Sequence, residues 1–350
     1  MTVDLVITTY KPTKTFFELV DKMSTQTVEI RKIIILNVEQ KYFDRLLYAT
    51  KFIEEHKNVE VRHISAREFD CGKSRNLAVK LSDADYVLMM GQNVVPNSSD
   101  VLEKLLKAIN SDEEIAASFA CQVLCDEAPE MFKFVRRFYF SQDSYVRSLK
   151  DFDNYGWTTF MCSNLCALYR RDIFNKLGGF SNHVICNEDV LFAAKALKEG
   201  YKIAYVSDAV ITDYKVLSED EAQRLSFDKA VSLAKHPEIF DISAIKDESK
   251  KIDKMTVAHL KRSGFKNDLF LHKKYSRALK KGFTKGVKYK KISMYDMRKY
   301  SANPEYWRID EILRDRNSVD VHSGYGKSEA EREMLSKPPV KALKKDAEEN

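Results

Sequence analysis

The sequence predicts an α/β protein in which helices cover both faces of a doubly wound, mostly parallel sheet. Over the first 235 residues, short apolar runs bounded by polar loops alternate with stretches whose apolar residues recur near a 3.6-residue period. A repeated strand-helix-strand order of this kind calls for a parallel sheet. The composition can also fill a large core, because 44% of the 350 residues are hydrophobic and 11% are aromatic. We place this domain at residues 1–235.

The expected elements follow one another in a regular order. Strands are predicted at Val3–Thr9, Lys32–Leu36, Val59–Ile64, Tyr86–Met90 and Ile115–Cys121. Amphipathic helices are predicted around residues 16–23, 46–52, 77–81 and 102–109. Ligands of such sheets bind at the carboxyl ends of the strands. Polar residues that follow a strand are therefore the first candidates for a functional site.

Several protein classes are disfavoured by the N-terminal residues and by the apolar runs. The first strand leads into Thr8-Thr9-Tyr10-Lys11-Pro12, which lacks the glycine-rich phosphate loops of dinucleotide-binding and P-loop enzymes. The N-terminus lacks the basic and apolar segments of a signal peptide, and no apolar run approaches the roughly 18 residues of a membrane helix. We therefore expect a cytoplasmic protein whose six cysteines are reduced thiols.

The basic residues are concentrated near the C-terminus. The net charge is +6, whereas residues 250–300 alone hold 17 Lys or Arg against three Asp. We interpret residues 236–316 as a basic helical extension and residues 317–350 as a disordered tail. The basic block suits an anionic membrane surface, which implies peripheral association with the inner face of the cell membrane, and a solvated helical surface is the alternative. Nucleic acid is not expected, because no nucleic-acid-binding motif accompanies the block.

Four polar stretches lie where a doubly wound sheet builds its site. They are Glu68–Asn76, Met89–Pro96, Trp157–Tyr169 and Asn187–Ala194. In the first, a helix N-terminus with Lys73 and Arg75 can bind phosphate oxygens, or else Asp70 or Ser74 only caps the helix.

The acidic pair Glu188-Asp189 also has a purely structural interpretation. Acids in a first helical turn complement the helix dipole, Asn187 suits the N-cap, and Gly200 suits a left-handed residue at the helix end.

Taken in order, these stretches resemble the bacterial family 2 glycosyltransferases, and within them the rhamnosyltransferase-like group. Val3–Tyr10 resembles the opening strand, Glu68–Asn76 the E-F-x-H-G-x-T-R-N loop, and Gln92–Pro96 the Q-D-A-x-P metal motif. Later matches are Gln122 at R-Q, Ser163-Asn164 at S-N, Gly178–Phe180 at G-G-F, Glu188-Asp189 at the E-D base motif, and Gly200–Tyr205 at G-Y-x-I-x-Y. The resemblance covers about residues 3–310.

The resemblance implies a GT-A fold, a nucleotide-diphosphate sugar donor and transfer with inversion at the anomeric carbon. It assigns Asp189 as the catalytic base that takes the acceptor proton, with Glu188 beside it. It implies donor-binding roles for Thr8, Thr9, Tyr10, Asn37, Asp70, Lys73, Arg75, Asn76, Gln92 and Asn93. It implies an acceptor and sugar pocket formed by Gln122, Trp157, Ser163 and Asn164.

The chain departs from the family at its metal motif. Asn93 replaces the metal-binding Asp, and an amide is a poorer ligand for a hard cation than a carboxylate. The H-S-H segment of the family aligns with Thr212-Asp213-Tyr214, and Cys121 replaces the R-Q arginine. Asn37-Val38-Glu39 stands where an Asp-containing motif is common.

Three alternatives follow for the metal. The enzyme works without one, with Arg75 and Lys73 carrying the diphosphate charge; it recruits Mg²⁺ or Mn²⁺ through Asp213 or Asp70; or it has lost transfer activity.

The leading hypothesis is an inverting glycosyltransferase that moves rhamnose from dTDP-rhamnose to a lipid-linked or polysaccharide acceptor in cell-surface glycan synthesis. The alternative is a noncatalytic nucleotide-sugar-binding or scaffold partner in a polysaccharide-synthesis complex.

Overall fold

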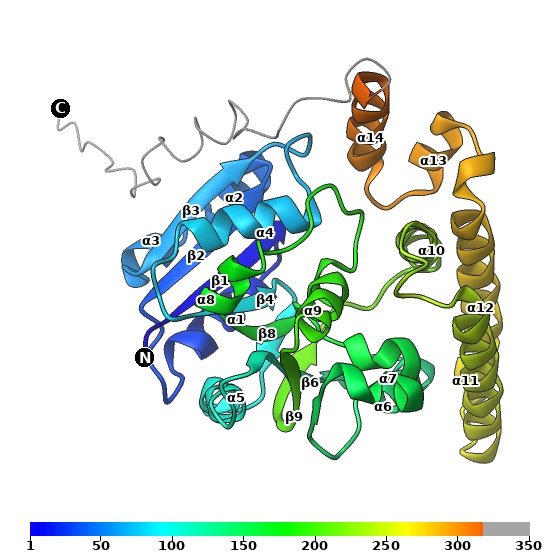
Figure 1. Ribbon diagram of the computed structural model, residues 1–350, viewed down its shortest axis with the longest axis horizontal. Helices are drawn as coiled ribbons and strands as arrows, with labels where there is room; N and C mark the ends of the chain where they lie inside the picture. Colours follow the sequence, from blue (N-terminus) through cyan, green and yellow to red (C-terminus); the bar gives the residue numbers. More distant parts are fainter. Residues whose placement is uncertain (318–350) are drawn as a thin grey trace.

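The computed structural model describes residues 1–317, in which a single nine-stranded sheet runs through the core (Figure 1). Its strands are β1 (Val3–Tyr10), β2 (Lys32–Val38), β3 (Val59–Ile64), β4 (Tyr86–Gly91), β5 (Val94–Pro96), β6 (Ile115–Leu124), β7 (Tyr145–Arg147), β8 (Cys166–Arg170) and β9 (Lys202–Asp213). The spatial order is β3-β2-β1-β4-β8-β6-β9-β5, and β7 pairs with β9.

Most of the sheet is parallel. Strands β1, β2, β3, β4, β6 and β9 run in one direction, whereas β5, β7 and β8 run against their neighbours. The central strands are buried on both faces, as parallel strands usually are. The carboxyl ends of β1, β4, β6 and β9 therefore meet at one edge, where the site is expected.

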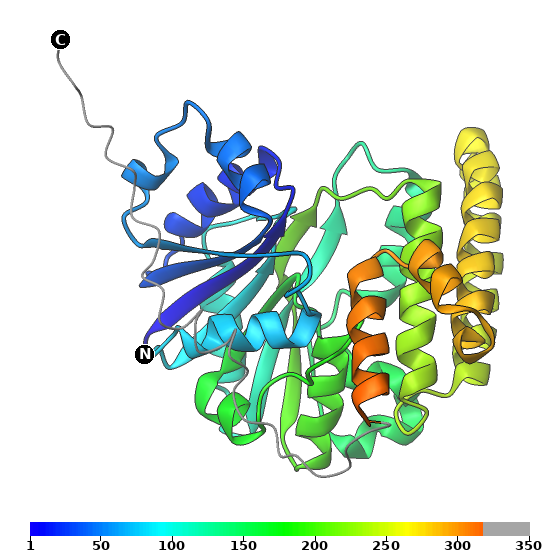
Figure 2. The ribbon, with the colours of Figure 1, turned by 90° about the horizontal axis from the view of Figure 1, so that it is seen from above.

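Helices cover both faces of the sheet (Figure 2). They are α1 (Thr15–Ser24), α2 (Gln40–Leu47), α3 (Phe52–Glu55), α4 (Cys71–Lys80), α5 (Val101–Ile109), α6 (Glu130–Tyr139), α7 (Phe152–Tyr155), α8 (Arg171–Lys176), α9 (Glu188–Lys198), α10 (Glu219–Lys235), α11 (Ile242–Arg262), α12 (Lys266–Val287), α13 (Met294–Tyr300) and α14 (Pro304–Asn317). Neighbouring strand residues point to opposite faces, so Leu5 packs with α1, α2, α3 and α5 while Val6 packs with α4, α8 and α9.

The periodicity located the main strands but missed some elements. Strands β5, β7 and β8 were not among the five predicted strands, and β6 continues to Leu124. The predicted helix at 46–52 is wrong as a continuous element, because the chain leaves the helical conformation at Ala49, whose φ is 59°, and α2 and α3 are separate.

The basic helices gather at the end of the sheet remote from the N-terminus (Figure 1). Helix α12 lies so close to α10 that a Cβ on Gly282 would come within 2.1 Å of the Gln223 carbonyl oxygen. A separate core cluster, which includes Phe227, Tyr289 and Trp307, joins α10 to α14. None of the helices within residues 1–317 is both long and apolar enough to cross a membrane. Residue 317, where the predicted tail begins, still belongs to α14; the rest of that tail lies outside the described residues, and the domain boundary at residue 235 stays a prediction.

Candidate active site

The acidic pair Glu188-Asp189 opens helix α9. Asn187 precedes it in the left-handed conformation, with φ 65°, and within the described chain its side chain makes no capping hydrogen bond. The prediction that Asn187 caps the helix with its side chain is therefore wrong, because a left-handed residue lacks the extended backbone of a typical N-cap. The prediction for Gly200 is confirmed, since its φ is 87°.

Asn164 connects the two acids to the neighbouring strand β8. Its backbone N–H donates to Asp189 Oδ2 at 2.9 Å, and its side-chain Nδ2 donates to Glu188 Oε1 at 3.0 Å. The Tyr169 hydroxyl donates to Asn164 Oδ1 at 2.8 Å and fixes the orientation of that amide. The fold thus brings together the predicted residues Asn164, Glu188 and Asp189.

The two carboxylates differ in their charge environment. Glu188 is only 6% exposed, and its Oε1 lies 2.9 Å from Nη1 of Arg75, so its charge is compensated. Within the described chain, Asp189 forms no ion pair with a basic side chain. Burial, and secondarily the Glu188 charge, raise its pKa to about 6. A carboxyl group tuned towards neutral pH is suited to general-base chemistry.

Two residues predicted to bind the donor also hold the loop before α9, and their donor-binding roles stay predictions. Asp70 caps α4, accepting from the backbone N–H groups of Gly72 and Lys73, and its second oxygen accepts from Val184 at 3.0 Å. Asn76 accepts from the Phe180 backbone N–H and donates to the Phe180 carbonyl at 2.8 Å. The capping alternative for Asp70 therefore holds, and the G-G-F segment is tied to α4.

The predicted donor residues outside residues 70–76 lie at the carboxyl ends of β1, β2 and β4, whereas Lys73 lies on α4. Thr9 Oγ1 donates to Asn37 Oδ1 at 2.9 Å, and Gln92 exchanges two hydrogen bonds with the Tyr10 backbone. The Tyr10 ring is 48% exposed. Thr8 pairs with Leu36 and Gly91 in the same part of the sheet. Thr9 and Asn37 are buried, and the donor-binding roles of all these residues stay predictions.

A second group of polar side chains lies at the carboxyl ends of β6 and β9. Arg136, on α6, donates from Nη1 to Gln122 Oε1 at 2.7 Å and from Nη2 to Asp213 Oδ2 at 3.0 Å. The other Asp213 oxygen accepts from the Lys215 backbone N–H. Sequence reasoning missed Arg136, because only the packing of α6 against β6 brings it to the strand ends.

The donor set at this edge does not fit a divalent cation. Asn93 lies beside Asp213, since the Tyr214 N–H donates to the Asn93 carbonyl at 2.9 Å. Asn93 offers only a neutral side chain, and both Asp213 oxygens are engaged, as are those of Asp70. Residues 1–317 contain no group of three or more His, Cys, Asp or Glu arranged to hold a metal ion. A metal recruited through Asp213 or Asp70 would have to share carboxylate oxygens that already accept these hydrogen bonds.

Of the other predicted pocket residues, Trp157 contacts α11. Trp157 donates its indole N–H to Glu248 of α11 at 2.8 Å, which connects the 3₁₀ turn Gly156–Phe160 to the extension. Ser163 lies directly before Asn164 in the loop that enters β8. Their contact with a sugar or acceptor stays a prediction.

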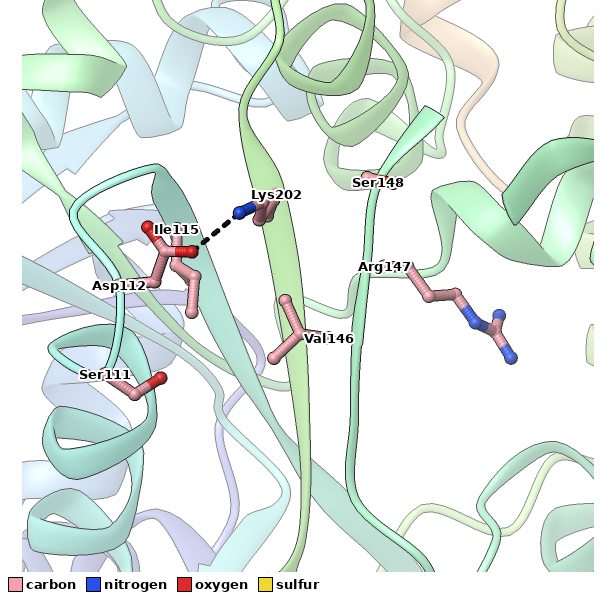
Figure 3. A pocket seen from close by; sticks show the side chains of 7 residues that line it. All are labelled: Ser111, Asp112, Ile115, Val146, Arg147, Ser148 and Lys202. Atoms are coloured by element: carbon pink, nitrogen blue, oxygen red, sulfur yellow. Dashed lines mark hydrogen bonds and ion pairs between the residues drawn. The ribbon is translucent and has the colours of Figure 1, made fainter. Parts of the chain in front are cut away.

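A cavity of about 390 Å³ lies elsewhere, at the starts of β6 and β9 (Figure 3). Its lining includes Lys202, whose ammonium group is held by Asp112 at 2.7 Å and by Glu114 at 2.8 Å. The Arg147 side chain points away from the other lining residues (Figure 3). Strands β6 and β9 begin at this cavity and end at the candidate site. The cavity is therefore separate from the carboxylate pair.

A sheet of this topology with a tuned carboxylate at its carboxyl edge is the arrangement of a GT-A glycosyltransferase. The chain matches the family model described as glycosyltransferase-like family 2 over residues 2–233. It belongs to that family and is a glycosyltransferase, so the predicted fold class and family resemblance are confirmed.

Two relatives are similar in sequence. The O-antigen chain rhamnosyltransferase RfbN of Salmonella typhimurium is 33% identical over 239 residues, which cover 68% of this chain and 74% of the relative. The O-antigen chain rhamnosyltransferase WbaN of Salmonella anatum is 34% identical over 176 residues, covering 50% of this chain and 55% of the relative.

One solved structure shares the fold. The mannosyltransferase PcManGT from Pyrobaculum calidifontis, in complex with GDP-mannose and Mn²⁺, matches with a TM-score of 0.50 at 15% identity, covering 91% of this chain and 88% of that one.

Proposed function

We propose that this glycosyltransferase transfers rhamnose from dTDP-rhamnose to a lipid-linked or polysaccharide acceptor in cell-surface glycan synthesis, with inversion at the anomeric carbon. The observation that carries the proposal is the position of Asp189: its carboxyl group, with a pKa raised to about 6 chiefly by burial, lies at the carboxyl edge of the sheet. The names of the two Salmonella relatives support the donor sugar and the glycan class.

The proposed reaction is a single displacement. Asp189 takes the proton from the acceptor hydroxyl while that oxygen forms a bond to the anomeric carbon. The bond from this carbon to the donor phosphate breaks in line, and the nucleoside diphosphate leaves. One displacement inverts the anomeric configuration. Glu188 is a poorer base, because its Oε1 already forms an ion pair with Arg75 and accepts from Asn164 Nδ2.

The donor would lie across the ends of β1, β2 and β4. The exposed Tyr10 ring offers a stacking surface for the nucleobase, and the buried Thr9–Asn37 pair lies behind it. Lys73, in the first turn of α4, can contribute charge towards the diphosphate.

Helix α12 supports the proposed contact with an anionic membrane. Its exposed basic side chains recur at helical spacing and share one face with Phe270, which is 62% exposed. They are Lys266, Lys273, Lys274, Arg277, Lys280 and Lys281, together with Lys288 directly after the helix, and within residues 1–317 none of them forms an ion pair. Each such residue near an anionic bilayer contributes about 1 kcal/mol. This face would hold the enzyme at the inner surface of the membrane, close to a lipid-linked acceptor.

The function is tested with purified protein, lipid-linked oligosaccharide and a panel of dTDP-rhamnose, UDP-sugars and GDP-mannose, each assayed with Mn²⁺ and with chelator. We expect release of dTDP and an acceptor heavier by one deoxyhexose. Donor binding without turnover under every condition would contradict the proposal and favour the noncatalytic alternative.

Membrane binding is tested by flotation with anionic and neutral liposomes. Changing Lys273, Lys280, Lys281 and Lys288 to Gln should abolish salt-sensitive binding to anionic vesicles. The matched control changes four exposed lysines outside the extension, Lys22, Lys57, Lys107 and Lys198, by the same total charge. Equal loss in both variants would contradict a specific role for α12.

A further inference from the structure

A guanidinium group lies at the edge of the sheet where the family resemblance placed a metal motif. The group belongs to Arg136, which with Gln122 and Asp213 forms what we call the Arg136 cluster. The Asp213 side chain is 8% exposed and the Arg136 side chain 22%, so the anion is covered while the cation remains partly accessible. Asn93 is next to this cluster through the backbone bond between Tyr214 and Asn93.

The opposite charges of Arg136 and Asp213 are consistent with the presence of Asn93 in place of the metal-binding Asp. An amide at residue 93 removes one negative charge compared with a carboxylate, which weakens the site for a divalent ion. The remaining carboxylate, Asp213, is balanced by the single charge of Arg136. A guanidinium stays protonated at any physiological pH and can donate to two phosphate oxygens at once. It can therefore stabilise a departing diphosphate without a metal.

A second observation points to a ligand at the same place. Gln122 is 3% exposed, and within the described chain its Nε2 has no hydrogen-bond partner, although its Oε1 accepts from Arg136. Buried N–H groups of native proteins nearly always have an acceptor. An oxygen of a bound phosphate would supply the acceptor that the protein does not.

We propose that Arg136, oriented by Asp213 and Gln122, binds the diphosphate of the nucleotide-sugar donor and replaces the divalent metal. This rests on the proposed function, since it names the group that binds the leaving diphosphate. It also adds Arg136 to Arg75 and Lys73, the two cations that the metal-independent alternative named from sequence. Asp213 is a positioning residue here, and Gln122 donates to a diphosphate oxygen.

The test compares nucleoside diphosphates with monophosphates by calorimetry in chelator, using the pairs dTDP and dTMP, UDP and UMP, and GDP and GMP. The wild-type protein should bind one diphosphate about 10- to 100-fold more tightly than its monophosphate, which is the usual range for charge-assisted hydrogen bonds. Arg136→Met should lose this preference and keep the monophosphate affinity. Arg136→Lys should recover part of it.

Two controls separate a binding role from a folding role. Arg137→Met removes the adjacent arginine of α6, which is exposed and paired with Glu130, and should leave the preference intact. Because Arg136→Met strands the buried Asp213 charge, the double variant Arg136→Met/Asp213→Asn is measured as well, with its melting temperature. The double variant should fold and still lack the preference.

The outcomes distinguish this inference from the proposed function. If a diphosphate binds only with Mn²⁺ and Arg136→Met binds it equally well, the role of Arg136 is overturned while donor binding stands. If the wild-type protein binds none of the six nucleotides with or without metal, both are overturned.

Discussion

The substitution Asp189→Asn tests the base with little change in shape. Asp189 accepts from the backbone N–H groups of Asn164 and Val190 at 2.9 Å each. An Asn side chain keeps one acceptor oxygen but turns an amide towards the other donor, so one buried hydrogen bond is lost. That loss costs about 1–3 kcal/mol of stability, which a shift in melting temperature reports. The amide cannot take a proton.

The expected loss of rate follows from the role of a general base. Such a group contributes about 10²- to 10⁴-fold, so kcat should fall by that factor. Burial, and secondarily Glu188, raise the pKa of Asp189 to about 6. At pH 7 the carboxyl group is therefore ionised in roughly nine tenths of the protein molecules. Because the base works when deprotonated, wild-type activity should rise with pH through about 6. The variant should lose this rise.

The assay is initial-rate dTDP release with saturating acceptor between pH 5 and 8. Asp172→Asn, which changes an exposed acid of α8, is the matched control and should leave both rate and profile unchanged. An Asp189→Asn protein that folds and transfers as fast as wild type would refute the base assignment.

Further predictions concern the surroundings of the site. Glu188→Gln should move the rise in the pH profile to lower pH, because it removes the charge that helps raise the Asp189 pKa; an unmoved rise would contradict the coupling. Burial raises the pKa of Asp228 to about 7, so its stabilising contribution is greatest at low pH and is lost as pH rises through 7. Asp228→Asn should therefore increase the free energy of unfolding at pH 8 by up to about 4 kcal/mol, seen as a higher melting temperature, and change it little at pH 4. An equal shift at both pH values would contradict this prediction. Gly72→Ala places a Cβ 1.9 Å from a carbonyl oxygen of the loop before α9 and should destabilise the protein by about 1–3 kcal/mol, measured by denaturant unfolding; an unchanged free energy of unfolding would contradict this close packing.

The sheet was predictable where burial on both faces leaves a continuous apolar run. Strands β1, β2 and β4 follow the predicted ranges within one or two residues, and β3, which is only partly buried, matches its predicted range. Strands β5 and β7 have three residues each, which is too short for a period to appear. Strand β8 lies in a stretch interpreted from its polar and aromatic residues as a pocket wall. Its pairing with β4 and β6 is a tertiary contact that no local pattern encodes.

The site was predictable in its motifs but not in its contacts. Glu188, Asp189 and Asn164 meet as the ordered motifs imply. Asp70 also caps a helix and Asn76 also binds backbone groups, contacts that the sequence pattern does not reveal, and their donor-binding roles stay predictions. Arg136 carries no motif, since its role depends on α6 lying beside β6.

The central claim is that Asp189 drives a single inverting displacement on a nucleotide-activated sugar. The most direct measurement is the anomeric configuration of the product, determined by NMR after complete reaction of purified enzyme with dTDP-rhamnose and acceptor. We predict one product whose anomeric configuration is opposite to that of the donor. A product that retains the donor configuration would contradict the single displacement and the role of Asp189 as its base.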